Sequence, residues 1–138
     1  MVSGIGGQLR ARVARRAGFR CEYCLIHQDD GGFPHQIDHI VSRKHGGASD
    51  FRNLAYACVF CNRHKGSDIA SIDQQTAHTV RLFHPRRDRW GDHFRIAGGF
   101  IEPITTVGSV TIRLLQLDAT ERIAERTILQ ALGRYPLT

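Results

Sequence analysis

The chain has 138 residues, which suits one compact domain with a buried core and a small appendage. Hydrophobic residues make up 41% of the sequence, a share that argues against disorder. No apolar run reaches the length of a membrane span, so we expect no membrane partner. Residues 1–7 lack the apolar segment of a secretory signal, and we therefore expect a cytoplasmic, intracellular protein.

The charge of the chain favours a polyanionic partner. Lysine and arginine number 19 against 13 aspartates and glutamates, which gives a net charge of +6 with the eight histidines neutral. Nucleic acid is the simplest partner for such a surface. A soluble basic protein with a solvated cationic surface is the alternative.

The first predicted element is an amphipathic helix over residues 8–17. Leu9, Val13 and Ala17 recur at a spacing of four residues, and arginines surround them, so the helix has an apolar face and a cationic face. Gly18 is expected to end the helix. The arginines are candidates for contacts with a phosphate backbone, and a solvated helix face is the alternative.

The four cysteines form two pairs of equal spacing, Cys21-x-x-Cys24 and Cys58-x-x-Cys61. In an intracellular protein, two such pairs are more typical of zinc ligands than of disulfides. Zinc in a structural site takes four ligands in a tetrahedron, and four thiolates supply them. A redox-active dithiol and a chance spacing are the alternatives.

The segment between the two cysteine pairs begins with a predicted strand. Residues 35–41 alternate well enough for a strand, with Ile37 and His39 on one face and Asp38 and Ile40 on the other. A carboxylate and an imidazole therefore stand side by side in the chain but point to opposite faces, unless a strand end or a bulge brings them together.

A loop, a second strand and a helix are predicted next. Residues 42–52 are polar and contain two glycines, which indicates a loop. Residues 53–57 can run back as a second strand, and residues 59–66 are compatible with a helix. His35 and His45 flank the loops, and we expect both to be exposed.

In these motifs the sequence resembles the HNH endonuclease family, from residue 18 to about residue 68. In that family two antiparallel strands and a helix form a ββα-metal finger that holds a catalytic divalent ion. The resemblance is carried by Cys21-x-x-Cys24, Ile37-Asp38-His39-Ile40, Gly46-Gly47, Arg52-Asn53-Leu54 and Cys58-x-x-Cys61-Asn62-Arg63-x-Lys65-Gly66.

The resemblance implies a role for each polar residue of the motif. His39 is the general base, and Asn53 orients it. Asp38 and Asn62 supply oxygen ligands for a catalytic Mg²⁺ or Mn²⁺, which would act as a Lewis acid on the scissile phosphate. The third position of the motif is often histidine, so this chain is an H-N-N variant. His64 is an alternative metal ligand.

Two cations follow the second cysteine pair. Arg63 and Lys65 lie within about one helical turn of Asn62, and we expect them to contact phosphates of the nucleic acid. A solvated helix face is the alternative for both.

Residues 69–138 lie outside the resemblance and predict a C-terminal α/β extension packed on the core. Residues 71–83 are ambiguous between helix and loop, and residues 109–117 between strand and helix. Short strands are predicted around 94–101 and 103–107.

The last predicted element is a helix that Asp118 caps and Gly133 ends, with Glu121 at the capping-box position. Its expected apolar stripe consists of Ile123, Ile128, Ala131 and Leu132.

A basic and aromatic segment precedes this helix. Its arginines, next to Trp90, could grip a nucleic-acid backbone while the indole stacks on a base. The favoured alternative is that Phe83, Trp90 and Phe94 pack the finger onto the last helix. The arginines in question are Arg86, Arg87 and Arg89.

We therefore predict an α+β chain in three parts: an N-terminal basic helix (1–17), an HNH nuclease core with a four-cysteine zinc site (18–68), and the C-terminal extension (69–138). The resemblance implies a metal-dependent endonuclease of bacterial or phage type that hydrolyses phosphodiester bonds in DNA. A non-catalytic, zinc-stabilised nucleic-acid-binding module and a nuclease component of a larger restriction, recombination or phage complex are the alternatives. No separate recognition domain is evident, which suggests low sequence specificity, a protein partner or a homodimer.

Overall fold

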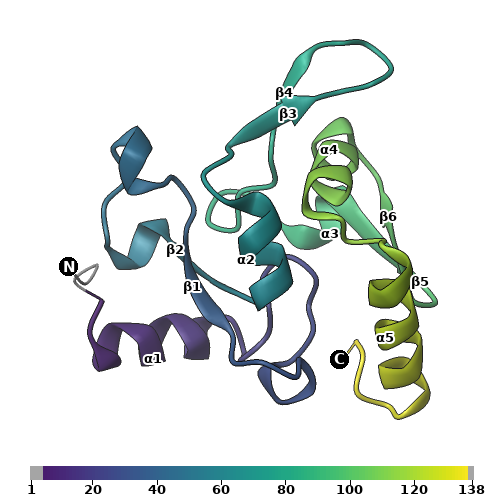
Figure 1. The fold of residues 1–138 in the computed structure, drawn as a ribbon, viewed down its shortest axis with the longest axis horizontal. Helices are drawn as coiled ribbons and strands as arrows, with labels where there is room; N and C mark the ends of the chain where they lie inside the picture. The colour runs from purple at the N-terminus through teal and green to yellow at the C-terminus, as the bar shows by residue number, and fades with distance from the viewer. Residues whose placement is uncertain (1–4, 137–138) are drawn as a thin grey trace.

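Helix α1 (Gly7–Arg16) is the first element of residues 5–136, the part of the chain that the computed structural model describes (Figure 1). It confirms the amphipathic helix expected over residues 8–17. Val13 and Ala14 are its buried residues, and they belong to a small core cluster that includes strand β2.

Part of the cationic face of α1 serves the fold. Arg16 donates hydrogen bonds to the carbonyl oxygens of Phe51 and Leu54, and its guanidinium lies 3.7 Å from the centre of the Phe51 ring. These contacts fix the start of β2 against the helix. Three further arginines of α1 stay exposed: Arg10, Arg12 and Arg15.

Strands β1 (Gln36–His39) and β2 (Leu54–Ala57) pair antiparallel, and helix α2 (Val59–Lys65) follows directly. The predicted ββα order is thus present. The alternation of β1 is also confirmed, because Asp38 is only 3% exposed whereas His39 is partly exposed on the opposite face. Short 3₁₀ turns connect the elements at Gln28–Asp30, Arg43–His45 and Phe51–Asn53.

His35 corrects one expectation. It is buried rather than exposed, its Nε2 is 2.9 Å from the carbonyl oxygen of Ile26, and its ring centre is 5.2 Å from that of Tyr56. An imidazole with a carbonyl partner and an aromatic neighbour can leave water at little cost. His45 is exposed, as expected.

The extension begins with a hairpin of β3 (Ala70–Ile72) and β4 (Thr79–Arg81), which projects from the body of the molecule at the top of Figure 1. The expectation of helix or loop for residues 71–83 was wrong. The turn is built on Asp73, whose carboxylate accepts a hydrogen bond of 2.7 Å from the hydroxyl of Thr76. Such a local side-chain bond stabilises a turn that no apolar periodicity reveals.

A second hairpin joins β5 (Phe94–Ala97) to β6 (Phe100–Pro103). The second strand starts earlier than the expected range 103–107. The reason is the turn between the strands, where Gly98 adopts φ of 62°, a conformation that side chains other than glycine rarely take.

Three helices complete the extension. Helix α4 (Thr106–Leu115) settles residues 109–115 as helix, and residues 116 and 117 form a turn. Thr105 caps the helix through a hydrogen bond of 3.1 Å from the amide of Gly108. The three are α3 (Trp90–His93), α4 (Thr106–Leu115) and α5 (Thr120–Ala131). Within residues 5–136, no helix is long and apolar enough to cross a membrane.

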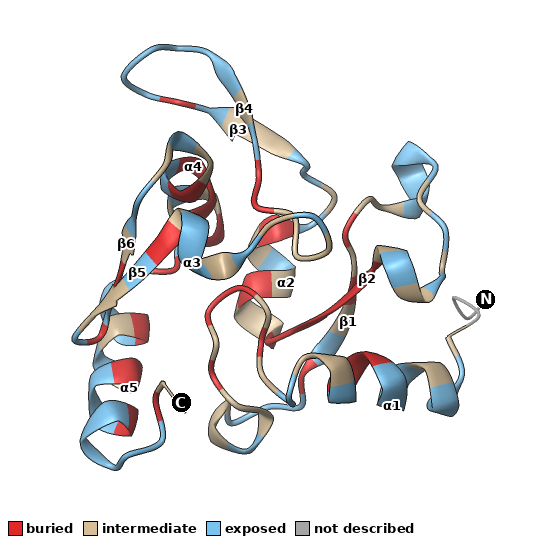
Figure 2. Cartoon of the chain, turned by 180° about the vertical axis from the view of Figure 1, so that it is seen from behind, coloured by how far each residue is buried: buried red, intermediate tan, exposed pale blue. Residues whose placement is uncertain are grey.

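Helix α5 buries a different face from the one that the sequence predicted. Ile128 and Leu132 of the expected apolar stripe are 61% and 68% exposed, while Arg122 and Arg126 are buried (red face of α5 in Figure 2). Asp118 does not cap the helix either. Its carboxylate instead accepts hydrogen bonds from the Ile101 amide at 3.0 Å and from Arg126 at 2.7 Å.

The main core lies between the cysteine pairs and the extension. Phe83 and Phe94 are buried in it with ring centres 5.3 Å apart, and Trp90 packs against it. The indole nitrogen of Trp90 donates to the carbonyl oxygen of Tyr23 at 2.9 Å. These aromatic residues therefore join the extension to the core, in a cluster that also contains Leu129 of the last helix. The α+β class is confirmed.

The ion pair between Asp118 and Arg126 supplies a test of the buried face of α5. The change Asp118→Ala leaves the fully buried Arg126 guanidinium without its carboxylate, and we expect a loss of about 2–3 kcal/mol in the free energy of unfolding. The change Glu102→Ala, which breaks an exposed ion pair with Arg95, should cost less than about 1 kcal/mol. Urea unfolding measures both, and equal losses would contradict the assigned role of Asp118.

Candidate active site and metal centre

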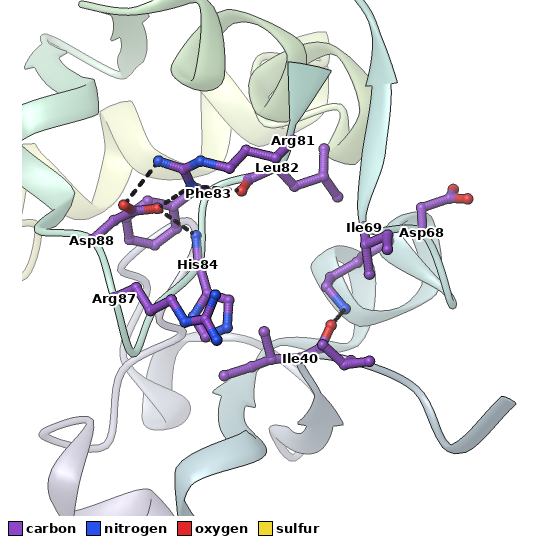
Figure 3. Close-up of a pocket in the computed structure, with 11 residues that line it drawn as sticks. Ile40, Asp68, Ile69, Arg81, Leu82, Phe83, His84, Arg87 and Asp88 are labelled. Atoms are coloured by element: carbon purple, nitrogen blue, oxygen red, sulfur yellow. Dashed lines mark hydrogen bonds and ion pairs between the residues drawn. The ribbon is translucent and has the colours of Figure 1, made fainter. Parts of the chain in front are cut away.

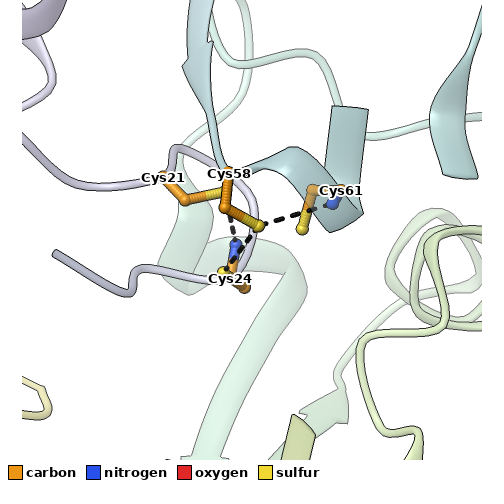
Figure 4. A group of neighbouring side chains, drawn as sticks. All are labelled: Cys21, Cys24, Cys58 and Cys61. Carbon is orange, nitrogen blue, oxygen red and sulfur yellow. Dashed lines mark hydrogen bonds between the residues drawn. The ribbon is translucent and has the colours of Figure 1, made fainter. Parts of the chain in front are cut away.

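The four cysteines come together from two separate parts of the chain. Cys21 and Cys24 lie in the loop after α1, and Cys58 and Cys61 lie at the junction of β2 and α2 (Figure 4). All four are buried, and their sulfur atoms lie within 4.8 Å of one another. They are free thiols in the structure. The cluster is therefore arranged to hold a metal ion.

The geometry fits a tetrahedral thiolate site. Four sulfurs at 2.3 Å from a shared zinc ion would lie about 3.8 Å apart, and the sulfurs of Cys24 and Cys58 are 3.8 Å apart. Backbone amides also point at the sulfurs: the Cys24 amide is 3.4 Å from Cys21 Sγ, and the Cys61 amide is 3.4 Å from Cys58 Sγ. These amides favour the thiolate form that metal binding requires.

A second group of residues gathers at the open side of the ββα unit. Asp38, His39 and Asn62 line one cleft of about 300 Å³. Ser42 also lines it, and its hydroxyl is buried without a hydrogen-bond partner. Three residues of the predicted catalytic set thus meet in one place, although they come from β1 and α2.

His39 presents its ring to the cleft from the exposed face of β1. Its Nε2 is 2.8 Å from the hydroxyl of Ser49. Burial lowers the pKa of His39 below its usual value, an effect that the charge of Asp38 opposes and those of Arg43 and Lys65 assist. The lowered pKa favours the neutral imidazole, which is the form that can accept a proton.

Asp38 lies at the inner wall of the cleft. The Tyr23 hydroxyl donates to Oδ2 at 2.7 Å, and Lys65 Nζ donates to Oδ1 at 3.3 Å. Burial raises the pKa of Asp38, and the charge of Lys65 opposes that rise. Each carboxylate oxygen has two acceptor sites and one of these donors, so each keeps one acceptor site for a further ligand.

The structure corrects the expected role of Lys65. The residue is 2% exposed, and its ammonium group is within hydrogen-bond distance of Asp38 Oδ1 and of the carbonyl oxygens of His39 and Ile40, at 3.2 and 3.0 Å. All three of its N–H donors are thereby used inside the protein. Lys65 therefore ties α2 to β1 and has no donor for a phosphate.

The other residues near α2 lie differently. The side-chain amide nitrogen of Asn62 donates to Gln36 Oε1 at 2.7 Å, which fixes the plane of the amide beside the cleft. Arg63 is exposed, with its guanidinium 5.6 Å from the centre of the Phe60 ring. His64 lines a different pocket from the one that holds Asn62. That position does not favour His64 as the alternative metal ligand.

Asn53 acts on the loop that follows β1. Its Oδ1 accepts from the Val41 amide at 3.0 Å, and its Nδ2 donates to the carbonyl oxygens of Val41 and Ala48, both at 2.8 Å. Gly47 permits this packing, because a Cβ atom there would lie 1.7 Å from the Val41 oxygen. Asn53 thus positions the loop that carries Ser49, and Ser49 in turn contacts His39.

Comparison with known proteins fits this geometry. Residues 21–68 match the model of the family described as HNH endonuclease. We call this matched segment the HNH domain. Its bounds include all four cysteines together with His39, Asn53 and Asn62. Among curated proteins and among solved structures, nothing matches the chain.

Two residues of the HNH domain were missed by the sequence reasoning. Ser49 contacts His39, and Tyr23 contacts Asp38. Ser49 lies in a polar loop that also contains Ser42, and the sequence does not tell which of the two hydroxyls faces the histidine. Tyr23 stands inside the first cysteine pair, where its spacing suggested only a turn. Neither carries a signal without the folded structure.

A further pocket, of about 390 Å³, lies where the HNH domain meets the extension. Figure 3 shows Ile40 and Ile69 on one side of it and His84 and Arg87 on the other. Asp88 braces the extension side, because its carboxylate accepts hydrogen bonds from Arg81 and from the His84 amide. Residues of the HNH domain and of the extension thus line this pocket together.

Lys65 and Arg63 provide a matched test of the HNH helix. The change Lys65→Met leaves the buried Asp38 carboxylate without its cation, and we expect a loss of about 3 kcal/mol in the free energy of unfolding. The change Arg63→Met on the exposed face should shift stability by less than about 0.5 kcal/mol. Urea unfolding decides, and a Lys65→Met protein as stable as the wild type would contradict the structural role.

Proposed function

We propose that the HNH domain is a metal-dependent endonuclease that hydrolyses phosphodiester bonds in DNA. The observation that carries the proposal is the cleft of about 300 Å³ that His39, Asp38 and Asn62 line together. The family match and the net charge of +6 support the same reaction and a polyanionic substrate.

His39 takes a proton from the attacking water. Its Nε2 lies 2.8 Å from the Ser49 hydroxyl, and in the tautomer that carries the ring proton on Nε2 the lone pair on Nδ1 accepts the proton of the water. The hydroxyl of Ser49 therefore helps to orient the ring, and Asn53 holds Ser49 in place by anchoring the loop. In this scheme Asn53 orients His39 through the loop, a role that the resemblance implied without showing the route.

Asp38 and Asn62 are the residues that would hold the catalytic divalent ion. A carboxylate and an amide oxygen are ligands that Mg²⁺ and Mn²⁺ prefer. When bound, the ion supplies Lewis-acid stabilisation of the phosphate and of the leaving oxygen. Tyr23 and Lys65 keep the Asp38 carboxylate in place from behind, and Gln36 does the same for Asn62.

The four-cysteine cluster would hold a structural zinc ion. All four ligands are cysteines, which leaves no open position for a substrate or water, as in structural zinc sites. The zinc ion would therefore take no part in the reaction and would hold the HNH domain in shape.

Arg63 remains the candidate phosphate contact on α2, because its side chain is exposed. The exposed arginines of α1 are available for the same purpose: Arg10, Arg12 and Arg15. A non-catalytic nucleic-acid-binding module would use the same cations, so binding alone does not separate it from the nuclease.

Plasmid nicking in the presence of Mg²⁺ or Mn²⁺ tests the proposal. The wild type should convert supercoiled DNA to the nicked form, and His39→Ala should lower the rate by at least about 100-fold because the general base is lost. Ser49→Ala should lower it less, since the imidazole remains. His78→Ala, at an exposed position of the β3–β4 turn, serves as the control and should cut like the wild type.

Either of two results would contradict the nuclease. One is a wild-type protein that binds DNA but does not cut it, whichever divalent ion is added. The other is a His39→Ala protein that cuts as fast as the wild type. The first result would favour the binding module.

A further inference from the structure

We propose that Arg122, on helix α5 of the extension, is an outer partner of the zinc site that bridges two of its thiolates and strengthens metal binding. The inference rests on the proposed zinc ion in the four-cysteine cluster. It concerns a residue outside the HNH domain, which spans residues 21–68.

The contact is direct and two-pronged. Arg122 Nη2 is 3.1 Å from Cys24 Sγ and 3.5 Å from Cys58 Sγ. These two sulfurs belong to different cysteine pairs and are 3.8 Å apart. One guanidinium nitrogen therefore spans the junction between the loop after α1 and the start of α2. Sulfur accepts such long hydrogen bonds well when it carries negative charge.

The negative charge of the thiolate cluster favours a cation in contact with its sulfur atoms. Four thiolates around one Zn²⁺ carry a formal charge of −2, and the cluster is closed off from water because all four cysteines are buried. A cation in contact with the sulfurs reduces that charge without competing for the metal. Arg122 is itself only 6% exposed, so solvent screens the attraction little.

Neighbouring side chains hold Arg122 in this position. Its guanidinium lies 4.8 Å from the centre of the Phe60 ring, and its Nη1 is 3.5 Å from Glu125 Oε1. The ring gives the planar group a face to stack on. The carboxylate satisfies a nitrogen that faces away from the sulfurs. These contacts, together with the two sulfur atoms, explain why the arginine is buried.

Other residues of the extension also bind the loop after α1 that carries the first cysteine pair. The hydroxyl of Tyr135 donates to the carbonyl oxygen of Cys24 at 2.8 Å, the indole of Trp90 bonds to the carbonyl oxygen of Tyr23, and Arg86 forms an ion pair with Glu22. The extension therefore closes over the first cysteine pair from several directions, and Arg122 is the contact that reaches the ligand atoms.

Competition for zinc against a chromogenic chelator tests the inference on the full-length protein. The wild type should contain about one zinc ion per chain, and Arg122→Gln should lower the apparent zinc affinity by about 10–100-fold, the usual effect of losing an outer partner. Arg95→Gln removes an exposed arginine of the extension that pairs with Glu102, and it should bind zinc like the wild type. Arg122→Lys keeps the charge without the planar fork and should fall between.

The outcomes separate this inference from the proposed function. A wild-type protein that folds without zinc would overturn both the zinc site and the role of Arg122. A zinc-containing wild type with an unchanged affinity in Arg122→Gln would overturn the role of Arg122 alone. If Arg122→Gln does not fold, Arg122→Lys decides, and a wild-type affinity in that variant would overturn the bridging contact. Circular dichroism of each zinc-loaded variant checks the fold.

Discussion

The meeting of four sulfurs from two distant segments is the constraint on which the rest of the structure depends. It joins the loop after α1 to the junction of β2 and α2, and so sets where β1 and β2 stand relative to α2. The cleft exists only if α2 lies beside the end of β1, because Asn62 and His39 come from these two elements. The extension packs over the same cluster, so one small centre organises both halves of the chain.

Strand β1 divides its chemistry between two faces. Its inward residue, Asp38, is neutralised by Lys65 and oriented by Tyr23, whereas His39 looks outward and contacts the loop that Asn53 anchors. The period of two in a strand enforces this division. Asp38 lines the cleft from the buried face of the strand and His39 from its partly exposed face. Each has its own supporting contacts, so each can be perturbed separately.

The order of elements in the HNH domain and the metal cluster could be predicted from the sequence, because spacing and alternation are local signals. The inward placement of Lys65, Arg122 and Arg126 could not. An isolated charge belongs at the surface, and it is buried only when a distant partner meets it. Those partners, among them Asp38 for Lys65 and Cys24 for Arg122, are brought close by tertiary contacts that no periodicity records. For the same reason the apolar stripe of α5 misled the prediction of its buried face.

The central claim is that the metal cluster holds the HNH domain and the extension together as one unit. Hydrogen–deuterium exchange of the zinc-loaded protein, repeated after zinc is removed with a chelator, tests it most directly. The account predicts that removal speeds exchange in β1, β2 and α2 and equally in α5, since Arg122 and the loop it grips lose their anchor. Faster exchange confined to the two cysteine pairs, with α5 still protected, would contradict it.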